Sequence, residues 1–246
     1  KRGKGSARLK SRGLSKEQIL NDPKLYRIRE NMSEFGGQSA MTKSFALALA
    51  TAIALADGTL RNRAMRVFTK VKNRSGGERG QRAFSLSQFK SSFKDFELNA
   101  RSALSRVLLA HSGAIVSTPS ATRNSVSLRV TLDYPDKQII APPEATHVQI
   151  THLLGVISDR EFDLEEGGYM LSEPTVDGVS ALSTSAPIEL GTHEPVSVSL
   201  ETTLPLETIP EKATVIEALG IECFQEVSGT QYSLKQGRGM KIINVF

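Results

Sequence analysis

The chain has 246 residues, of which 39% are hydrophobic and 23% charged, and its formal net charge is +5. This composition argues against a membrane-spanning or a disulfide-stapled protein. The longest apolar run, residues 45–56, is too short to cross a bilayer, and Cys223 is the single cysteine. The length suits one large domain or two small ones.

Charge is divided unequally along the chain. Residues 1–106 hold 23 Lys and Arg against 8 Asp and Glu, which gives +15, whereas residues 107–246 hold 8 against 18, which gives −10. Such a charge asymmetry gives information about binding partners rather than about the fold. The residue pattern changes at the same point. We therefore predict a flexible basic arm at residues 1–14, a helical domain at 15–106 and a β-domain at 107–246.

Two helices are predicted first. The motif SKEQ at residues 15–18 has capping-box spacing, which predicts a short helix beginning at Ser15. An Asp-Pro pair then opens the segment NDPKLYRIRENMSEFGG at residues 21–37. Its apolar residues Leu25, Ile28, Met32 and Phe35 recur at helical spacing on one face, and the glycine pair at 36–37 predicts the end of this helix.

The remaining helical patterns extend to residue 106. We predict a buried helix over residues 39–56 and an amphipathic helix from Thr59, in which Phe68 belongs to the apolar face. Three glycines in NRSGGERGQR, residues 73–82, predict an exposed loop. Phe89, Phe93 and Phe96 are spaced for a last helix. Together these patterns predict a small helical bundle.

From residue 107 the pattern favours strands. SVSLRVTLD at residues 125–133 alternates strictly between apolar and polar residues, as do ATHVQITHLL at 145–154 and PVSVSLETTLPL at 195–206. Residues 223–234 have the pattern of a hairpin with its turn around Gly229, and MKIINVF is a final strand. Short strands separated by turn residues predict an antiparallel β-sandwich, so the expected fold class is α+β.

Three segments also carry a resemblance. GLSKEQILNDPKLYRIRENMSEFG, APPEATHVQI and LGIECFQEVSGTQYSLKQG resemble, in this order, a family of bacterial proteins of about this size with no assigned function. The resemblance implies that the helical and β parts belong together, and it brings no catalytic residues and no ligand. Members of that family start with a further glycine-rich segment. We therefore expect a natural start upstream of Lys1, and only the lack of a visible signal peptide favours the cytoplasm.

The segment RNRAMRVFTKVKNRSGGERGQR, residues 61–82, holds the strongest concentration of positive charge. We predict that it binds an acidic partner, and no exposed aromatic residue accompanies it for stacking on bases. A phosphate backbone and a plain solvated face stay open as alternatives. The eight basic residues are Arg61, Arg63, Arg66, Lys70, Lys72, Arg74, Arg79 and Arg82.

An acidic counter-surface is predicted in REFDLEEGG, residues 160–168. Glu161, Asp163 and Glu165 would share one face of a strand, and Glu166 follows them. Such a group could collect Ca²⁺ or act as a general acid and base. Like charges on one face more often mark a solvent-exposed or protected strand, and we favour that interpretation.

Other motifs do not support catalysis. His147 and His152 are five residues apart in a predicted strand, so they point to opposite faces and do not share a metal. SSFK at residues 91–94 lacks the companion motifs of Ser-x-x-Lys enzymes, and GRG at 237–239 is too short for a phosphate loop. We therefore predict no enzyme activity, no cofactor and no metal, and the sequence identifies no small-molecule substrate.

The sequence thus favours a structural protein that assembles with copies of itself into a filament, ring or shell. The basic half of one copy would dock on the acidic half of the next. The alternative is a nucleic-acid-associated protein whose helical half binds phosphates, and a third interpretation is a phage- or secretion-related accessory protein with another acidic partner. We expect no membrane partner. The opposite charges can also meet within one molecule, in which case they say nothing about assembly.

Overall fold

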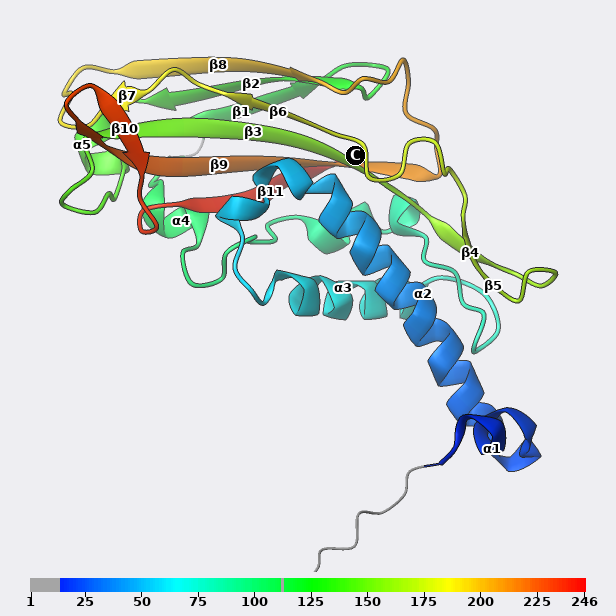
Figure 1. Ribbon diagram of the computed structural model, residues 1–246. Helices are drawn as coiled ribbons and strands as arrows, with labels where there is room; N and C mark the ends of the chain where they lie inside the picture. Colours follow the sequence, from blue (N-terminus) through cyan, green and yellow to red (C-terminus); the bar gives the residue numbers. More distant parts are fainter. Residues whose placement is uncertain (1–13, 112) are drawn as a thin grey trace, which may run out of the picture.

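The computed structural model describes residues 14–111 and 113–246 (Figure 1). The predicted basic arm therefore lies outside the described residues, except for Leu14. The helices are α1 (Lys16–Asn21), α2 (Tyr26–Ala48), α3 (Leu60–Arg74), α4 (Leu104–Val107) and α5 (Pro135–Gln138). The strands are β1 (Ile115–Pro119), β2 (Ser125–Leu132), β3 (His147–Ser158), β4 (Arg160–Asp163), β5 (Gly168–Leu171), β6 (Ser180–Thr184), β7 (Ile188–Glu189), β8 (Val196–Thr203), β9 (Ala213–Val227), β10 (Thr230–Ser233) and β11 (Gly239–Val245).

Two antiparallel sheets form the β part. In the larger sheet β3 pairs with β9 along its whole length, from His147 opposite Phe224 to Ser158 opposite Ala213. Strands β6 and β7 extend it on the β3 side, and β10 and β11 on the β9 side. The smaller sheet has the order β1-β2-β8, and β4 pairs with β5 in a separate hairpin.

The two faces of the larger sheet are covered by different layers. On one face, Leu153 of β3 and Ile216 of β9 pack with Phe45 of α2 and Phe68 of α3. On the other face, residues of β3 and β9 such as Ile150 pack with β2 of the smaller sheet. Strand β2 has one buried face, so its predicted alternation is confirmed: Val126, Leu128, Val130 and Leu132 are buried. Strands β3 and β9 are buried on both faces over most of their length.

The α+β class is confirmed. The finer expectations are not: the described residues hold only two long helices, α2 and α3, and these lie on the larger sheet rather than forming a bundle by themselves (Figure 1). The predicted boundary between residues 106 and 107 falls inside α4. The division into two domains stays a prediction. The helices and the larger sheet share one core.

Helix α2 corrects the prediction that glycines 36–37 end a helix. The helix continues through them to Ala48, and residues 50–55 form a 3₁₀ turn instead of the end of a second α-helix. A Cβ atom at Gly37 would lie 2.6 Å from side-chain carbons of both Phe84 and Tyr169. This glycine therefore allows close packing rather than terminating the helix.

A second correction concerns the phenylalanines. Residues 86–88 and 90–93 form short 3₁₀ turns, so the helix predicted over this segment does not exist. The rings still gather: Phe93 stacks on Phe45 at a centroid distance of 4.7 Å, and Phe96 meets both edge-on. The position of this segment is therefore set by the packing of large rings in the core and not by helical periodicity.

Two local predictions are confirmed. The Ser15 side chain accepts a hydrogen bond from Gln18 N at 3.1 Å, and the Gln18 side chain accepts one from Ser15 N at 2.8 Å, which completes the capping box of α1. The β9–β10 hairpin turns at Ser228 and Gly229, both of which have positive φ. This turn matches the twist of the flanking strands.

Candidate assembly surfaces

The structure divides the eight basic residues of segment 61–82 into two groups. Arg63, Lys72 and Arg82 are bound inside the molecule, as described below. The others are exposed: Arg61, Arg66, Lys70, Arg74 and Arg79. The sequence alone gave no signal for this division, because it depends on partners distant along the chain.

Glu34 of α2 is the partner of two internal cations. Its side chain is 3% exposed, and Lys72 Nζ donates to its Oε2 at 2.7 Å. Arg82 binds the same carboxylate with two nitrogens, Nε and Nη2, both at 2.7 Å, and Gly80 N donates to Oε1 at 2.9 Å. Burial raises the pKa of Glu34, but the hydrogen bonds from Arg82, Lys72 and Gly80 outweigh it and lower the pKa to about 2. The Glu34 cluster therefore fixes loop 73–82 against α2.

Arg63 connects α3 to the segment that follows the phenylalanines. Its guanidinium donates to the carbonyl oxygens of Glu97 and Leu98 and lies 3.4 Å from Asp57 Oδ1. It also covers the Phe96 ring at 5.0 Å. This cation has a structural role, and it is not available to a partner.

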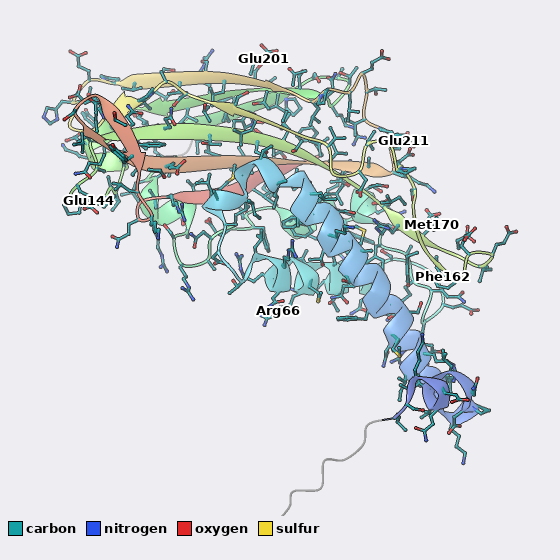
Figure 2. All side chains as sticks on the ribbon, in the orientation of Figure 1. Arg66, Glu144, Phe162, Met170, Glu201 and Glu211 are labelled. Atoms are coloured by element: carbon teal, nitrogen blue, oxygen red, sulfur yellow. The ribbon has the colours of Figure 1, made fainter. Side chains whose placement is uncertain are left out.

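The exposed cations form a stripe along α3. Arg66, Lys70 and Arg74 follow at four-residue spacing, which puts them on one side of the helix, and Arg66 points away from both sheets (Figure 2). Among the described residues, no carboxylate lies within ion-pair distance of Arg61, Arg66, Lys70 or Arg74. Arg79 differs, because its Nε lies 3.5 Å from Glu30 Oε2.

The predicted acidic face is partly wrong. Glu161 and Asp163 lie in β4, but the strand ends at Asp163, and Glu165 and Glu166 belong to the turn before β5. Asp163 Oδ1 accepts hydrogen bonds from the backbone N–H groups of both turn residues, at 2.8 and 2.9 Å. Glu161 is bound to Lys212 Nζ at 2.8 Å. The exposed acids at the hairpin tip are therefore Glu165 and Glu166.

The N-terminal part of α2 carries apolar side chains that none of the described residues covers. Helix α1 and this part of α2 project from the body of the molecule, and we call residues 14–35 the helical arm (Figure 1). Met32 is 53% exposed and Phe35 is 59% exposed, and Leu20 and Tyr26 are about half exposed as well. The sequence predicted one apolar face here, but that face does not pack on the core.

A second group of exposed apolar residues belongs to the segments that flank α4 and α5, and α5 lies at the end of the molecule opposite α1 (Figure 1). We call Leu109, Tyr134 and Ile140 the distal patch; each is about half exposed. Their segments are joined, since Leu109 N donates to the Gln138 carbonyl at 2.7 Å. Glu144 lies at the same end (Figure 2). Neither surface was singled out by the sequence as a binding site, because exposure depends on tertiary structure.

A buried polar network joins the two sheets. His152 Nδ1 lies 2.8 Å from Thr202 Oγ1, and His152 Nε2 lies 3.1 Å from Glu217 Oε1. Ser117 Oγ donates to the other Glu217 oxygen at 2.7 Å. A hydroxyl, an imidazole and a carboxylate in this order resemble a hydrolytic triad, but His152, Thr202 and Glu217 are at most 1% exposed. A substrate cannot reach them, so the network links strands β1, β3, β8 and β9.

Sequence reasoning missed Glu217, although a signal was present. It is the single charged residue in the otherwise apolar run ATVIEALGI, where a carboxylate has to be buried with a partner. Among the described residues, no group of three or more His, Cys, Asp or Glu side chains is arranged to hold a metal ion. In the same part of the chain, no helix combines the length and the apolarity that crossing a membrane requires.

No protein-family model matches the sequence, and no curated protein matches it either. The resemblance to a bacterial family of unassigned function stays a prediction.

Proposed function

We propose that this chain is a non-enzymatic structural protein that assembles head to tail with copies of itself. The observation that carries the proposal is the helical arm at one end, with apolar side chains uncovered, and the distal patch at the other end (Figure 1). A contact between two different surfaces leaves one of each free, so the assembly grows into a filament or closes into a ring.

Burial of apolar surface supplies the driving force in this proposal. Met32 and Phe35 are each more than half exposed, and covering a Met or Phe side chain fully contributes about 1.5–3 kcal/mol. Exposed apolar groups that cluster, rather than lie singly, mark interaction surfaces. A second copy of the chain would supply an apolar partner for either surface, because it carries both an apolar arm and an apolar patch.

Charge complementarity supports a second copy as the occupant. Residues 1–13, which precede the arm, hold six Lys and Arg and no acid. Residues 133–144, beside the distal patch, hold Asp133, Asp136 and Glu144 against one Lys, although Asp133 and Asp136 lie 3.6 and 3.2 Å from histidine side chains of the same chain. Where two docking segments carry opposite charge, the charge steers encounter and disfavours docking of like segments. In this proposal the two facing sheets act as a β-sandwich, with the helices packed on one side, and hold the two ends apart.

One pair of variants tests this arrangement. The arm variant carries Met32→Ser and Phe35→Ser, and the patch variant carries Tyr134→Ser and Ile140→Ser. In sedimentation velocity each variant alone stays monomeric, whereas an equimolar mixture forms a 1:1 dimer, because each retains the surface that the other lacks. Ile53→Ser, at an exposed position outside both surfaces, leaves assembly unchanged. A mixture that stays monomeric contradicts the proposal.

The α3 stripe favours a second candidate function, binding of nucleic acid. Arg61, Arg66, Lys70 and Arg74 are exposed without an acidic partner among the described residues, and Phe68 is buried, so contacts would be made to phosphates rather than to bases. Fluorescence anisotropy with a labelled duplex tests this candidate. Charge reversal of Arg66 and Lys70 should reduce both the affinity and its dependence on salt.

A further inference from the structure

A cavity of about 710 Å³ lies between three segments of the chain. It is bordered by residues 56–59 before α3, by residues 99–102 and by the loop 235–238 that connects β10 to β11. We propose that this cavity binds a small phosphate-bearing molecule, such as a phosphate monoester. This inference is independent of assembly and of the α3 stripe.

Three cations line the cavity: Arg101, Lys235 and Arg238. No described carboxylate forms an ion pair with any of them. The Nε atom of Arg238 is buried and has no hydrogen-bond partner among the described residues. Buried donors are normally satisfied, but this atom is closed to solvent, so the accessible parts of Arg101, Lys235 and Arg238 are the groups that would contact a ligand.

The one carboxylate in the lining, Asp57, does not neutralise these cations. Thr59 N donates to its Oδ1 at 2.7 Å and Ala100 N to its Oδ2 at 2.7 Å, and Arg63 supplies its nearest positive charge. Burial raises the pKa of Asp57, but these hydrogen bonds lower it to about 2, so it stays ionised and internally bound. The cavity therefore keeps an excess of positive charge.

Two glycines allow the loop 235–238 to pack closely against the rest of the chain. Gly237 has φ +71°, and a Cβ atom there would lie 2.5 Å from Pro142 and 2.8 Å from the Cys223 sulfur. A Cβ atom at Gly239 would lie 2.8 Å from the Ser102 carbonyl oxygen. The loop thus packs closely on the body and presents Arg238 next to residues 99–102. The GRG motif is no phosphate loop by itself, but it places one wall of this cavity.

The chemistry of the lining selects the ligand class. Guanidinium groups bind tetrahedral oxyanions through paired N–H donors, and charge-assisted hydrogen bonds of this kind are about twice as strong as neutral ones. A phosphate dianion matches two guanidinium groups and an ammonium group better than a single carboxylate does. The volume exceeds that of inorganic phosphate, and cavities of about 300–1,000 Å³ hold small organic ligands.

Isothermal titration calorimetry of the full chain tests the proposal, with inorganic phosphate, glycerol 3-phosphate, AMP and acetate as probes. We expect a phosphomonoester to bind more tightly than acetate. Arg101→Gln and Arg238→Gln should each weaken this binding at least about tenfold. The matched control is Arg106→Gln, which lies nearby in α4, is exposed and does not line the cavity; its affinity should equal that of the unmodified chain.

Three results would overturn the inference. The first is that no phosphate probe gives a heat of binding up to about 10 mM, which corresponds to a binding free energy weaker than about 3 kcal/mol. The second is that Arg101→Gln binds the phosphomonoester as tightly as the unmodified chain does. The third is that Arg106→Gln loses as much affinity as Arg101→Gln. If Arg238→Gln fails to fold by circular dichroism, the exposed Lys235→Gln replaces it with the same expectation.

Discussion

Replacement of Glu34 by Gln should make the stability of this protein less dependent on pH. Glu34 is the acceptor for Lys72, Arg82 and the Gly80 N–H group in a site where its side chain is 3% exposed. The carboxylate has a folded-state pKa of about 2 against an ordinary value of 4.5. Because the folded value is the lower one, ionised Glu34 stabilises the folded state above pH 4.5, and this contribution is lost as the pH falls towards 2.

The magnitude follows from the difference between the two pKa values. A shift from 4.5 to about 2 corresponds to about 3 kcal/mol at pH 7 and to about 1 kcal/mol at pH 3. This difference already contains the loss of the charged partner of Lys72 and Arg82, because their hydrogen bonds to Glu34 cause the shift. The free energy of unfolding of Glu34→Gln should therefore be lower by about 3 kcal/mol at pH 7, and this difference should shrink by about 2 kcal/mol at pH 3.

Urea denaturation at pH 7, 5 and 3, followed by circular dichroism, measures this difference. Glu30→Gln is the matched control: Glu30 lies one turn earlier in α2 and pairs with the exposed cations Arg27 and Arg79. Pairs of this kind contribute about 0–1 kcal/mol, so the control should stay close to the unmodified chain at every pH. The reasoning is refuted if the effect of Glu34→Gln is the same at pH 7 and pH 3, or if Glu30→Gln destabilises equally.

Three further predictions rest on single contacts. Gly37→Ala should destabilise the folded chain by about 1–3 kcal/mol because of overpacking. Gly36→Ala is the control: a Cβ atom there would have no atom within 4 Å, so this variant should stabilise the helix by up to about 1 kcal/mol. Thermal melts that give both variants the same stability would contradict the close-packing explanation. Glu217→Ala should cost about 3–5 kcal/mol because it leaves buried polar partners unpaired, and Glu211→Ala, which is exposed, should change the free energy of unfolding by no more than about 0.5 kcal/mol. Cys223 is fully buried and burial raises its pKa to about 11, so a thiol reagent at pH 8 should label it only in denaturant; rapid labelling of the folded chain would refute this placement.

The sequence predicted those elements whose signals are local. The capping box at Ser15 and the hairpin turn at Gly229 each depend on a few adjacent residues, and both are confirmed. Strand β2 was predicted well because only one of its faces is buried.

The errors arose where distant residues decide the structure. Glycines 36–37 have the local pattern of a helix end, and only the approach of Phe84 and Tyr169 explains why the helix continues. The position of Phe93 is determined by ring packing in the core and not by helical spacing.

The candidate surfaces followed the same rule. The concentration of charge at residues 61–82 was visible in the sequence, but the sequence does not say which cations face inward. Lys72 and Arg82 are 38 and 48 residues from Glu34 along the chain, so no local pattern links them. The helical arm has an apolar face by periodicity, and only the fold reveals that the other described residues leave this face exposed.

Negative-stain electron microscopy of the purified chain, with its absorbance ratio at 260 and 280 nm recorded, tests the central proposal most directly. Samples at about 50 mM and about 500 mM salt separate steering by charge from apolar contact, since the higher salt screens exposed charges beyond about 4 Å. Self-assembly predicts regular filaments or rings with no nucleic-acid absorbance, and fewer of them at high salt. Featureless monomers with a raised 260 nm absorbance would contradict it and favour nucleic acid as the partner.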